Sequence, residues 1–405
     1  MTARPRPEVR PPILVYVPHG AIPDRRGFSP AIVACEFARR TRLVRPWLAC
    51  AAEQDPVGRD TWEGLPVARL GRRRLYTRLR KLGLRPPGWT LAADFLALCR
   101  EIAPALLHVH QLEFDVYELG RRFHDIPTIV HAHVLTHPAS PGRGRAAFYV
   151  AVSDHVARGL ADLGYPAERT ITIRNGVDTQ LFAPADDLSA ARAKERLGLA
   201  PGTPVLAFVG RKHDVKGYPA FLAVAERLLA HMDSLMVLAI GADPERPSGE
   251  AGFTRSRERE RRLMATGRFR SLPALRQIDL ARAYDAIDVT LLPSLAETQG
   301  MAIIESMAAG CVTISARVGG VAETLQNAVT GFLVDDPRDV DALYERAAAV
   351  LARLPDYATM RAAARAYAVQ YLDWAVSAAR LDDLYKTVVS GIQDVPPGFA
   401  AGDGI

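Results

Sequence analysis

The sequence predicts an α/β protein with two doubly wound, Rossmann-like domains that face a cleft. At 405 residues the chain is too long for one ordinary hydrophobic core and suits two domains. Apolar runs of strand length alternate with helical patterns along it, which is typical of parallel sheets covered by helices. The alternation forms two series that meet near residues 175–184. Ligands of such sheets bind beyond the carboxyl ends of the strands.

The two series define an N-terminal domain of residues 1–180 and a C-terminal domain of residues 181–374. Helical spacing of apolar residues predicts helices at Ala31–Arg40 and Leu91–Ile102, and a helical tail through Tyr357–Ser390. Short apolar runs predict the strands Ile13–Val17, Ala105–His110, Thr128–Val134, Tyr149–Val152, Thr170–Arg174, Val205–Val209, Leu235–Ile240, Val289–Leu292, Val312–Ser315 and Phe332–Val334.

Composition indicates a soluble globular protein, with 49% hydrophobic and 24% charged residues. No apolar run reaches a membrane-spanning length and the N-terminus lacks a signal-peptide core, so a cytoplasmic location is expected. The net charge of +6 raises the possibility of nucleic acid, but no nucleic-acid-binding motif accompanies it. The scattered cysteines are expected to be buried thiols: Cys35, Cys50, Cys99 and Cys311.

The segment Pro293–Asp335 places two carboxylates around the start of a helix. A loop, LAETQG, leaves the strand that ends at Leu292, and a short helix over Met301–Ala309 is entered at Gly300. Backbone N–H groups at such a helix start bind phosphate. Glu297 lies in the loop, and Glu305 lies among apolar neighbours, where it needs a fixed donor or ligand hydroxyls.

A basic loop, GRKHDVKG, follows the first strand of the second series. Arg211, Lys212 and Lys216 lie there among small residues, and cations at the carboxyl end of a strand suit a diphosphate. The alternative is an ordinary solvated turn. At the junction of the series, RNGVD contains Asn175-Gly176, a strong turn signal that we interpret as structural.

Two histidine-rich strand ends, PALLHVH and IPTIVHAHVLTH, lie in the first series. Paired histidines suggest zinc. We expect the spacing of two residues to turn the paired rings to opposite faces, and therefore predict no metal site. His108 and His131 are expected to be satisfied core histidines.

The segment from Glu297 to Glu305 resembles the Glu-x-seven-Glu signature of the retaining GT-B glycosyltransferases called group one. The downstream Gly319-Gly320, Glu323 and Thr330–Val334 are similar to that family as well. The resemblance implies a GT-B fold with an acceptor-binding first domain and a donor-binding second domain. It also implies that the last helix, about residues 375–395, packs back onto the first domain.

The resemblance assigns roles to residues at matching positions. Glu297 would contact the donor sugar, Glu305 the ribose hydroxyls, and Arg211 with Lys216 the diphosphate. His133 is the best match to the histidine that approaches the sugar, with His131 as the runner-up. Where relatives have Gly and an aromatic after the first Glu, this chain has Thr298 and Gln299, which could tune sugar choice. The remaining expected donor contacts are Gly300, Met301 and Gly20. Gly20 lies in the loop after the first strand, which has fewer glycines than the corresponding loop of relatives.

The expected function is metal-independent transfer of a sugar from a nucleotide-sugar, such as a UDP- or GDP-sugar, to an acceptor hydroxyl with retention, and no cofactor is needed. Alternatives are a sugar-phosphate or glucan synthase of the same fold, a soluble small-molecule glycosyltransferase, and a non-catalytic nucleotide-sugar-binding subunit. A nicotinamide oxidoreductase is disfavoured because no Gly-x-Gly-x-x-Gly joins a first strand to a helix.

Residues 69–85 carry eight Lys or Arg interleaved with leucines and no acid. A solvated loop is one interpretation. The other is peripheral binding to an anionic membrane surface, which would suit a lipid-linked or envelope-polysaccharide acceptor and a role in polysaccharide biosynthesis.

Overall fold

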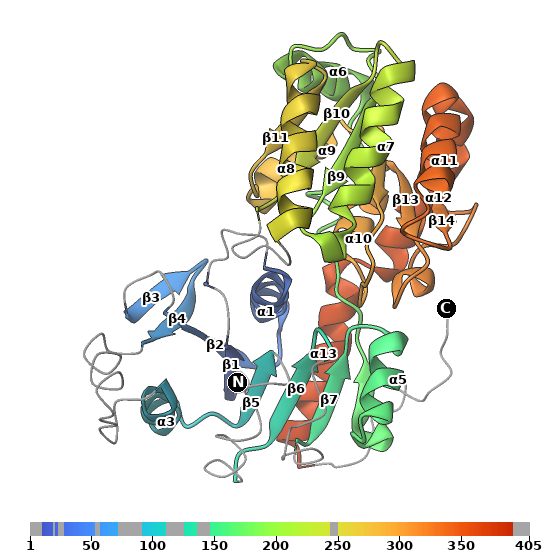
Figure 1. Ribbon diagram of the computed structural model, residues 1–405. Helices are drawn as coiled ribbons and strands as arrows, with labels where there is room; N and C mark the ends of the chain where they lie inside the picture. Colours follow the sequence, from blue (N-terminus) through green and yellow to red (C-terminus); the bar gives the residue numbers. More distant parts are fainter. Residues whose placement is uncertain are drawn as a thin grey trace, which may run out of the picture. The chain divides into compact units, whose positions relative to one another are not determined.

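The computed structural model describes residues 10–18, 21–22, 28–52, 57–71, 91–110, 125–135, 146–243 and 250–391, without the side chains of 91–93 and 250–253. The described residues form two compact units. Unit 1 contains those up to Ile173 and those from Ser377 onward, and unit 2 is Arg174–Val376. Figure 1 shows a sheet with covering helices in each unit. No helix among the described residues is long and apolar enough to span a bilayer.

Unit 1 is built on an eight-stranded sheet in the order β3-β4-β2-β1-β5-β6-β7-β8. Its pairs are parallel except for the β3–β4 hairpin, whose turn residues Glu63 and Gly64 have positive φ angles of 48° and 81°. The strands are β1 Pro12–Val17, β2 Arg45–Ala51, β3 Gly58–Trp62, β4 Leu65–Leu70, β5 Leu106–His110, β6 Thr128–Ala132, β7 Phe148–Ala151 and β8 Thr170–Thr172.

The helices of unit 1 are α1 Ser29–Arg40, α3 Leu91–Ile102, α5 Asp154–Asp162 and most of α13 Trp374–Val389. Helix α13 returns from the end of the chain and is tied to this unit by side chains. Its Asp382 accepts hydrogen bonds from the Thr41 hydroxyl and the Arg42 N–H, and its Tyr385 hydroxyl contacts His108.

Unit 2 is built on a six-stranded parallel sheet in the order β11-β10-β9-β12-β13-β14. Successive residues of β9 point to different cores: Val205, Ala207 and Val209 to one, and Leu206 and Phe208 to the other. Helices therefore cover both faces. The strands are β9 Val205–Val209, β10 Met236–Ile240, β11 Phe269–Leu272, β12 Val289–Leu292, β13 Val312–Ala316 and β14 Phe332–Val334.

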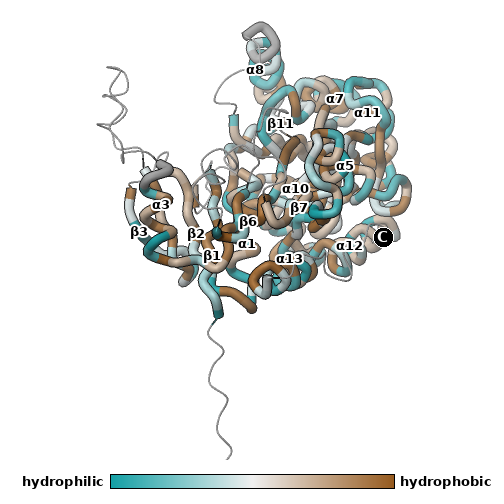
Figure 2. Tube along the Cα trace, turned by 90° about the horizontal axis from the view of Figure 1, so that it is seen from below, coloured by the Kyte–Doolittle hydropathy of each residue, from teal (hydrophilic) through white to brown (hydrophobic). Residues whose placement is uncertain are grey.

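Helix α8 of unit 2 is rich in charged residues. Figure 2 shows much of α8 in teal, whereas strands such as β1 and β6 of the other unit are largely brown. The helices are α6 Asp187–Arg196, α7 Tyr218–His231, α8 Glu250–Ala265, α9 Gln277–Tyr284, α10 Met301–Ala308, α11 Val340–Ala352 and α12 Ala358–Tyr371.

Each strand predicted from the sequence has a counterpart, and the four cysteines are buried. The strands predicted to end at Val134 and Arg174 end two residues earlier, at Ala132 and Thr172. The prediction missed β2, β3, β4 and β11. In β3 the reason is plain: four of its five residues are exposed, so no apolar pattern marks it.

The strand order of unit 2 determines where a ligand site can form. β9 pairs with β10 on one side and with β12 on the other, so the order reverses between β9 and β12. Such a reversal opens a crevice at the carboxyl ends of the two strands. The loops that leave β9 and β12 are the basic loop and the loop that carries Glu297.

Candidate active site

The loops that leave β9 and β12 pack directly against each other. Gly217, at the end of the β9 loop, has a φ of 70°, and a Cβ atom there would lie 1.8 Å from the Pro293 carbonyl oxygen. No larger residue fits without moving the backbone. Nearby, the Leu295 N–H donates to the Val215 carbonyl at 2.8 Å. The two loops thus form one structural element at the reversal point.

The basic side chains of the β9 loop have different environments. Lys216 forms an ion pair with Glu297, with 2.5 Å between Nζ and Oε2. Arg211 is exposed and has no side-chain partner among the described residues. Lys212 is buried and donates to the Ser271 hydroxyl and the Leu272 carbonyl, and burial lowers its pKa. Arg211 and Lys216 are therefore the cations that can meet a ligand.

The start of α10 offers free backbone donors. Gly300 is the N-cap, with a φ of 94°, and no side chain caps the helix. The N–H groups of Ile303 and Ile304 both donate to the Gly300 carbonyl. Those of Met301 and Ala302 have no backbone acceptor in the described chain, which leaves the positive end of the helix open to an anion.

Glu305 is a buried carboxylate with little protein support. It is 4% exposed, and its one hydrogen bond within the described residues comes from Gln277 Nε2 at 3.3 Å. Burial raises the pKa of Glu305 to about 7, and the Gln277 hydrogen bond opposes that change. Because the carboxylate lacks strong donors, it can accept hydrogen bonds from ligand hydroxyls. The sequence did not reveal Gln277, which lies on another helix.

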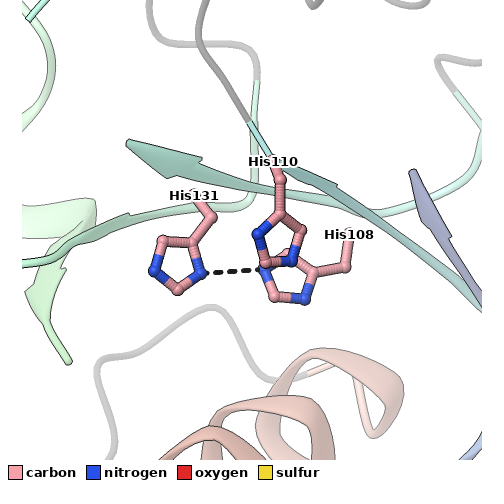
Figure 3. Close-up of side chains that lie close together, drawn as sticks. All are labelled: His108, His110 and His131. Carbon is pink, nitrogen blue, oxygen red and sulfur yellow. Dashed lines mark hydrogen bonds between the residues drawn. The ribbon is translucent and has the colours of Figure 1, made fainter. Parts of the chain in front are cut away.

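The prediction that the paired histidines point to opposite faces is wrong. Residues i and i+2 of a strand share a face. The rings of His108 and His110 on β5 lie 4.4 Å apart between centroids, and that of His131 on β6 stacks 4.9 Å from His110. His133, which follows β6, stacks 4.6 Å from His131. Figure 3 shows three of these rings drawn together from the two strands.

Hydrogen bonds connect the four buried histidines. His108 Nδ1 lies 2.6 Å from the Tyr385 hydroxyl, His131 Nδ1 3.3 Å from His108 Nε2, and His110 Nδ1 2.9 Å from His133 Nε2. His108 is the satisfied core histidine that was expected, but Nε2 of His131, like that of His110, has no partner within the described structure. Burial lowers the pKa of His133 to about 3, so it is neutral at physiological pH.

The junction segment RNGVD is held to the ETQG loop by Gln299. This side chain is 1% exposed, accepts from the Asn175 N–H at 2.7 Å and donates to the Asn175 carbonyl at 2.9 Å. These bonds give Gln299 a structural role that the sequence did not indicate. A Cβ on Gly176 would lie 2.6 Å from the Trp374 Cα, which explains the glycine.

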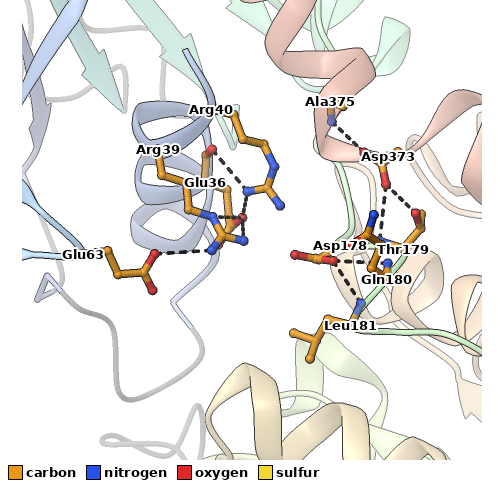
Figure 4. A network of polar contacts seen from close by, with 10 residues as sticks. All are labelled: Glu36, Arg39, Arg40, Glu63, Asp178, Thr179, Gln180, Leu181, Asp373 and Ala375. Carbon is orange, nitrogen blue, oxygen red and sulfur yellow. Dashed lines mark hydrogen bonds and ion pairs between the residues drawn. The ribbon is translucent and has the colours of Figure 1, made fainter. Parts of the chain in front are cut away.

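Carboxylates fix the backbone that follows Gly176. Asp178 accepts from the Gln180 and Leu181 N–H groups, and Asp373 accepts from Thr179 and the Ala375 N–H (Figure 4). The same figure shows a separate network on α1 of unit 1, in which Glu36 accepts from Arg39 and Arg40.

The Gly319-Gly320 pair lies next to Glu297 and contacts its backbone. The Gly320 N–H donates to the Glu297 carbonyl at 3.1 Å, and Gly319 has a φ of 53°. Glu323, further along the chain, forms an ion pair with Arg174, with 3.6 Å between Oε2 and Nη2. Thr298 is partly buried in the same loop. Gly20 lies outside the described residues, as does most of the basic stretch 69–85, from residue 72 onward.

Family comparisons agree with this architecture in both units. Residues 189–367 match the family described as Glycosyl transferases group 1, and residues 24–181 match Glycosyltransferase Family 4. These matches, together with the solved structures below, support a group 1 glycosyltransferase. Its fold is that of GT-B glycosyltransferases, with two Rossmann-like domains built on parallel sheets.

Among similar curated proteins is the D-inositol 3-phosphate glycosyltransferase of Thermobispora bispora, 34% identical over 60% of this chain and 56% of the relative. That of Geodermatophilus obscurus is 37% identical over 49% of this chain and 44% of the relative. The chain therefore spans about half the length of these relatives.

Solved structures show the same fold at lower identity. Sucrose-phosphate synthase from Thermosynechococcus elongatus has a TM-score of 0.76 and 21% identity, covering 94% of this chain and 100% of that one. HepE from Anabaena in complex with UDP and glucose has a TM-score of 0.73 and 18% identity, covering 93% of this chain and 100% of that one.

Proposed function

We propose that the protein transfers a sugar from a nucleoside-diphosphate sugar to an acceptor hydroxyl, with retention at the anomeric carbon. The observation that carries this proposal is that the loops after β9 and β12 pack against each other where the strand order of unit 2 reverses. It brings Lys216 and Glu297 into contact and places the open start of α10 in the same loop as Glu297. The matches to the glycosyltransferase family models support it as well.

Each side chain then has a chemical role. Arg211 and Lys216 meet the diphosphate, together with the free N–H groups near Gly300, and Glu305 accepts hydrogen bonds from the ribose. In the free enzyme Glu297 holds the Lys216 ammonium. When the donor binds, the diphosphate takes over that cation and Glu297 turns to the sugar hydroxyls.

The transfer step can proceed without a divalent ion at the diphosphate. The bond between the anomeric carbon and the phosphate oxygen breaks, and the acceptor oxygen attacks from the same face. A phosphate oxygen takes the acceptor proton. Negative charge grows on the leaving group, and fixed cations favour that transition state. The neutral His133 is proposed to contact the donor sugar, with Thr298 and Met301 among the remaining donor contacts.

The acceptor is assigned to residues 1–180 and the donor to residues 181–374. The relatives favour a phosphorylated acceptor as a second candidate, since their names specify D-inositol 3-phosphate and the product sucrose phosphate. A lipid-linked acceptor remains the proposal motivated by residues 69–85, with peripheral membrane association. The two differ in whether a soluble phosphorylated polyol accepts the sugar.

A screen of nucleotide-sugars tests the function. The true donor at about 100 times its dissociation constant is expected to stabilise the protein by roughly 2.7 kcal/mol and to be hydrolysed slowly without acceptor. Arg211→Ala should abolish that stabilisation, whereas Arg282→Ala, an exposed residue of α9, should retain it. Stabilisation without turnover for any acceptor would instead support a binding subunit, and no stabilisation by any nucleotide-sugar would refute the proposal.

A further inference from the structure

Three histidines of unit 1 converge on one point of the protein interior. One ring nitrogen from each of His108, His110 and His131 lies within 4.8 Å of the other two, and all three side chains are buried (Figure 3). His110 and His131 are direct neighbours in the β5–β6 register. The convergence is therefore set by two paired strands of the sheet.

The hydrogen bonds of these rings leave nitrogens available for a ligand. His108 directs Nδ1 to the Tyr385 hydroxyl and Nε2 to His131 Nδ1, whereas His110 directs Nδ1 to His133 and keeps its Nε2. Nε2 of His110 and of His131 is buried without a partner in the described part of the chain. A buried polar atom without a partner is costly, and a ligand at His110 Nε2 would remove one such cost from the cluster.

The spacing of the nitrogens suits a transition-metal ion. Zn²⁺ binds imidazole nitrogen at about 2.0–2.1 Å in tetrahedral geometry, which separates two ligand nitrogens by roughly 3.3 Å. His108 Nε2 and His131 Nδ1 are 3.3 Å apart and share a hydrogen bond, which a metal ion bound to both nitrogens would replace. A nitrogen of His110 lies within 4.8 Å of the other ligand atoms and must move closer to bind the same ion. Imidazole is a preferred ligand of zinc and of its neighbours copper and nickel.

The outer contacts also match a metal site. A metal-bound histidine normally donates its other N–H to an oxygen or another acceptor, which fixes its orientation. Tyr385 is placed for this at His108, and His133 Nε2 at His110.

We propose that His108, His110 and His131 bind a single divalent transition-metal ion, Zn²⁺ by preference, in a structural site that joins β5, β6 and α13. His133 and Tyr385 act as positioning residues that hold two of the ligands. The three ligands are not among the residues proposed to contact the diphosphate, and no step of sugar transfer passes through the metal ion. The inference does not rest on the proposed function.

The metal content of the full-length chain, produced without a histidine tag, tests the site. Because the ligands are buried, the protein is unfolded with a chelator and refolded with Zn²⁺ or with Co²⁺, and free metal is then removed. One equivalent per chain is expected, with the intense visible bands of tetrahedral Co²⁺. His110→Gln and His131→Gln should lose it, whereas His231→Gln, an exposed histidine of α7, should retain it.

Tyr385→Phe gives a second test that keeps all three ligands. Loss of its hydroxyl should weaken metal binding by about 10–100-fold, as removal of an outer partner does at known sites. This variant decides the matter if the histidine variants do not fold. A wild-type chain that refolds and retains no metal, or equal metal in His231→Gln and the ligand variants, would show that the rings form only a neutral hydrogen-bonded stack.

Discussion

Replacement of Glu305 by Gln should make the free protein more stable and the donor complex weaker. The carboxylate is buried with one hydrogen bond of 3.3 Å, from Gln277, and burial raises its pKa to about 7. Gln keeps the shape and that acceptor but carries no charge. The free protein gains stability because folding no longer has to desolvate a charged carboxylate. The donor complex loses affinity because the ligand hydroxyls no longer donate to a charged acceptor.

The size of the stability gain follows from the pKa. The ordinary pKa of the group is 4.5 and the folded one about 7. The unfolded chain therefore ionises first, and the folded protein loses stability as pH rises from 4.5 to about 7. The full loss is about 3 kcal/mol, at 1.36 kcal/mol for each pH unit between the two values. Below 4.5 both states are protonated and the carboxyl costs nothing.

Urea unfolding at about pH 5 and pH 8 measures this difference. Glu305→Gln should gain under 1 kcal/mol at the lower pH and about 3 kcal/mol at the higher one. Glu345→Gln, which removes an exposed carboxylate of α11, should change neither value. Equal gains at the two pH values would refute the desolvation argument.

Donor titration of the same variants separates a ligand contact from a structural carboxylate. A hydrogen bond to a charged group contributes about 1.5–3 kcal/mol, so Glu305→Gln should bind the nucleotide roughly 10–150-fold more weakly. Wild-type affinity should also rise between pH 6 and pH 8, because the ionised form accepts the ribose hydrogen bonds. If the variant binds the donor as tightly as the wild type, Glu305 does not contact it.

Four further outcomes are expected. Lys216→Ala should keep its fold by circular dichroism and lose about 10²–10³ in turnover, whereas Arg282→Ala should be unaffected; near-normal turnover of the first would remove Lys216 from the site. Turnover should be the same with added Mg²⁺, with Mn²⁺ and after brief EDTA treatment, and restoration by either ion would show that cationic side chains are insufficient. Gly217→Ala should cost several kcal/mol in urea unfolding because its Cβ would meet Pro293, and a cost below about 0.5 kcal/mol would contradict that contact. The chain should sediment with anionic liposomes at low salt and less at high salt, and equal binding by a variant with four arginines of residues 69–85 changed to Ser would rule out that segment.

The sequence predicted the fold well because buried parallel strands are short apolar runs. The runs at Val205–Val209 and Val289–Leu292 were located to the residue. Strand β3 escaped because it is largely exposed and pairs at the sheet edge. Strand neighbours were not predictable either, and it is the strand order that brings the β9 and β12 loops together.

The candidate site was predicted unevenly. The resemblance drew attention to Lys216 and Glu297, but their ion pair joins residues 81 positions apart, which periodicity cannot reveal. Gln299 was expected to tune the sugar, yet its amide is engaged by the Asn175 backbone. The prediction for the histidine rings was wrong because side chains along a strand alternate with a period of two residues. Residues two positions apart therefore point to the same face, not to opposite faces.

The division of the chain has a consequence for how the protein is made. Among the residues that the structure describes, unit 2 is one uninterrupted segment, Arg174–Val376, inserted between two parts of unit 1. On a ribosome, unit 2 can complete its sheet as soon as it emerges, whereas unit 1 must wait for α13 to supply Tyr385 to His108 and Asp382 to Arg42. Although it is synthesised first, unit 1 should be the last to finish folding. Nascent chains that stop before α13 should therefore expose buried histidines to chaperones and proteases.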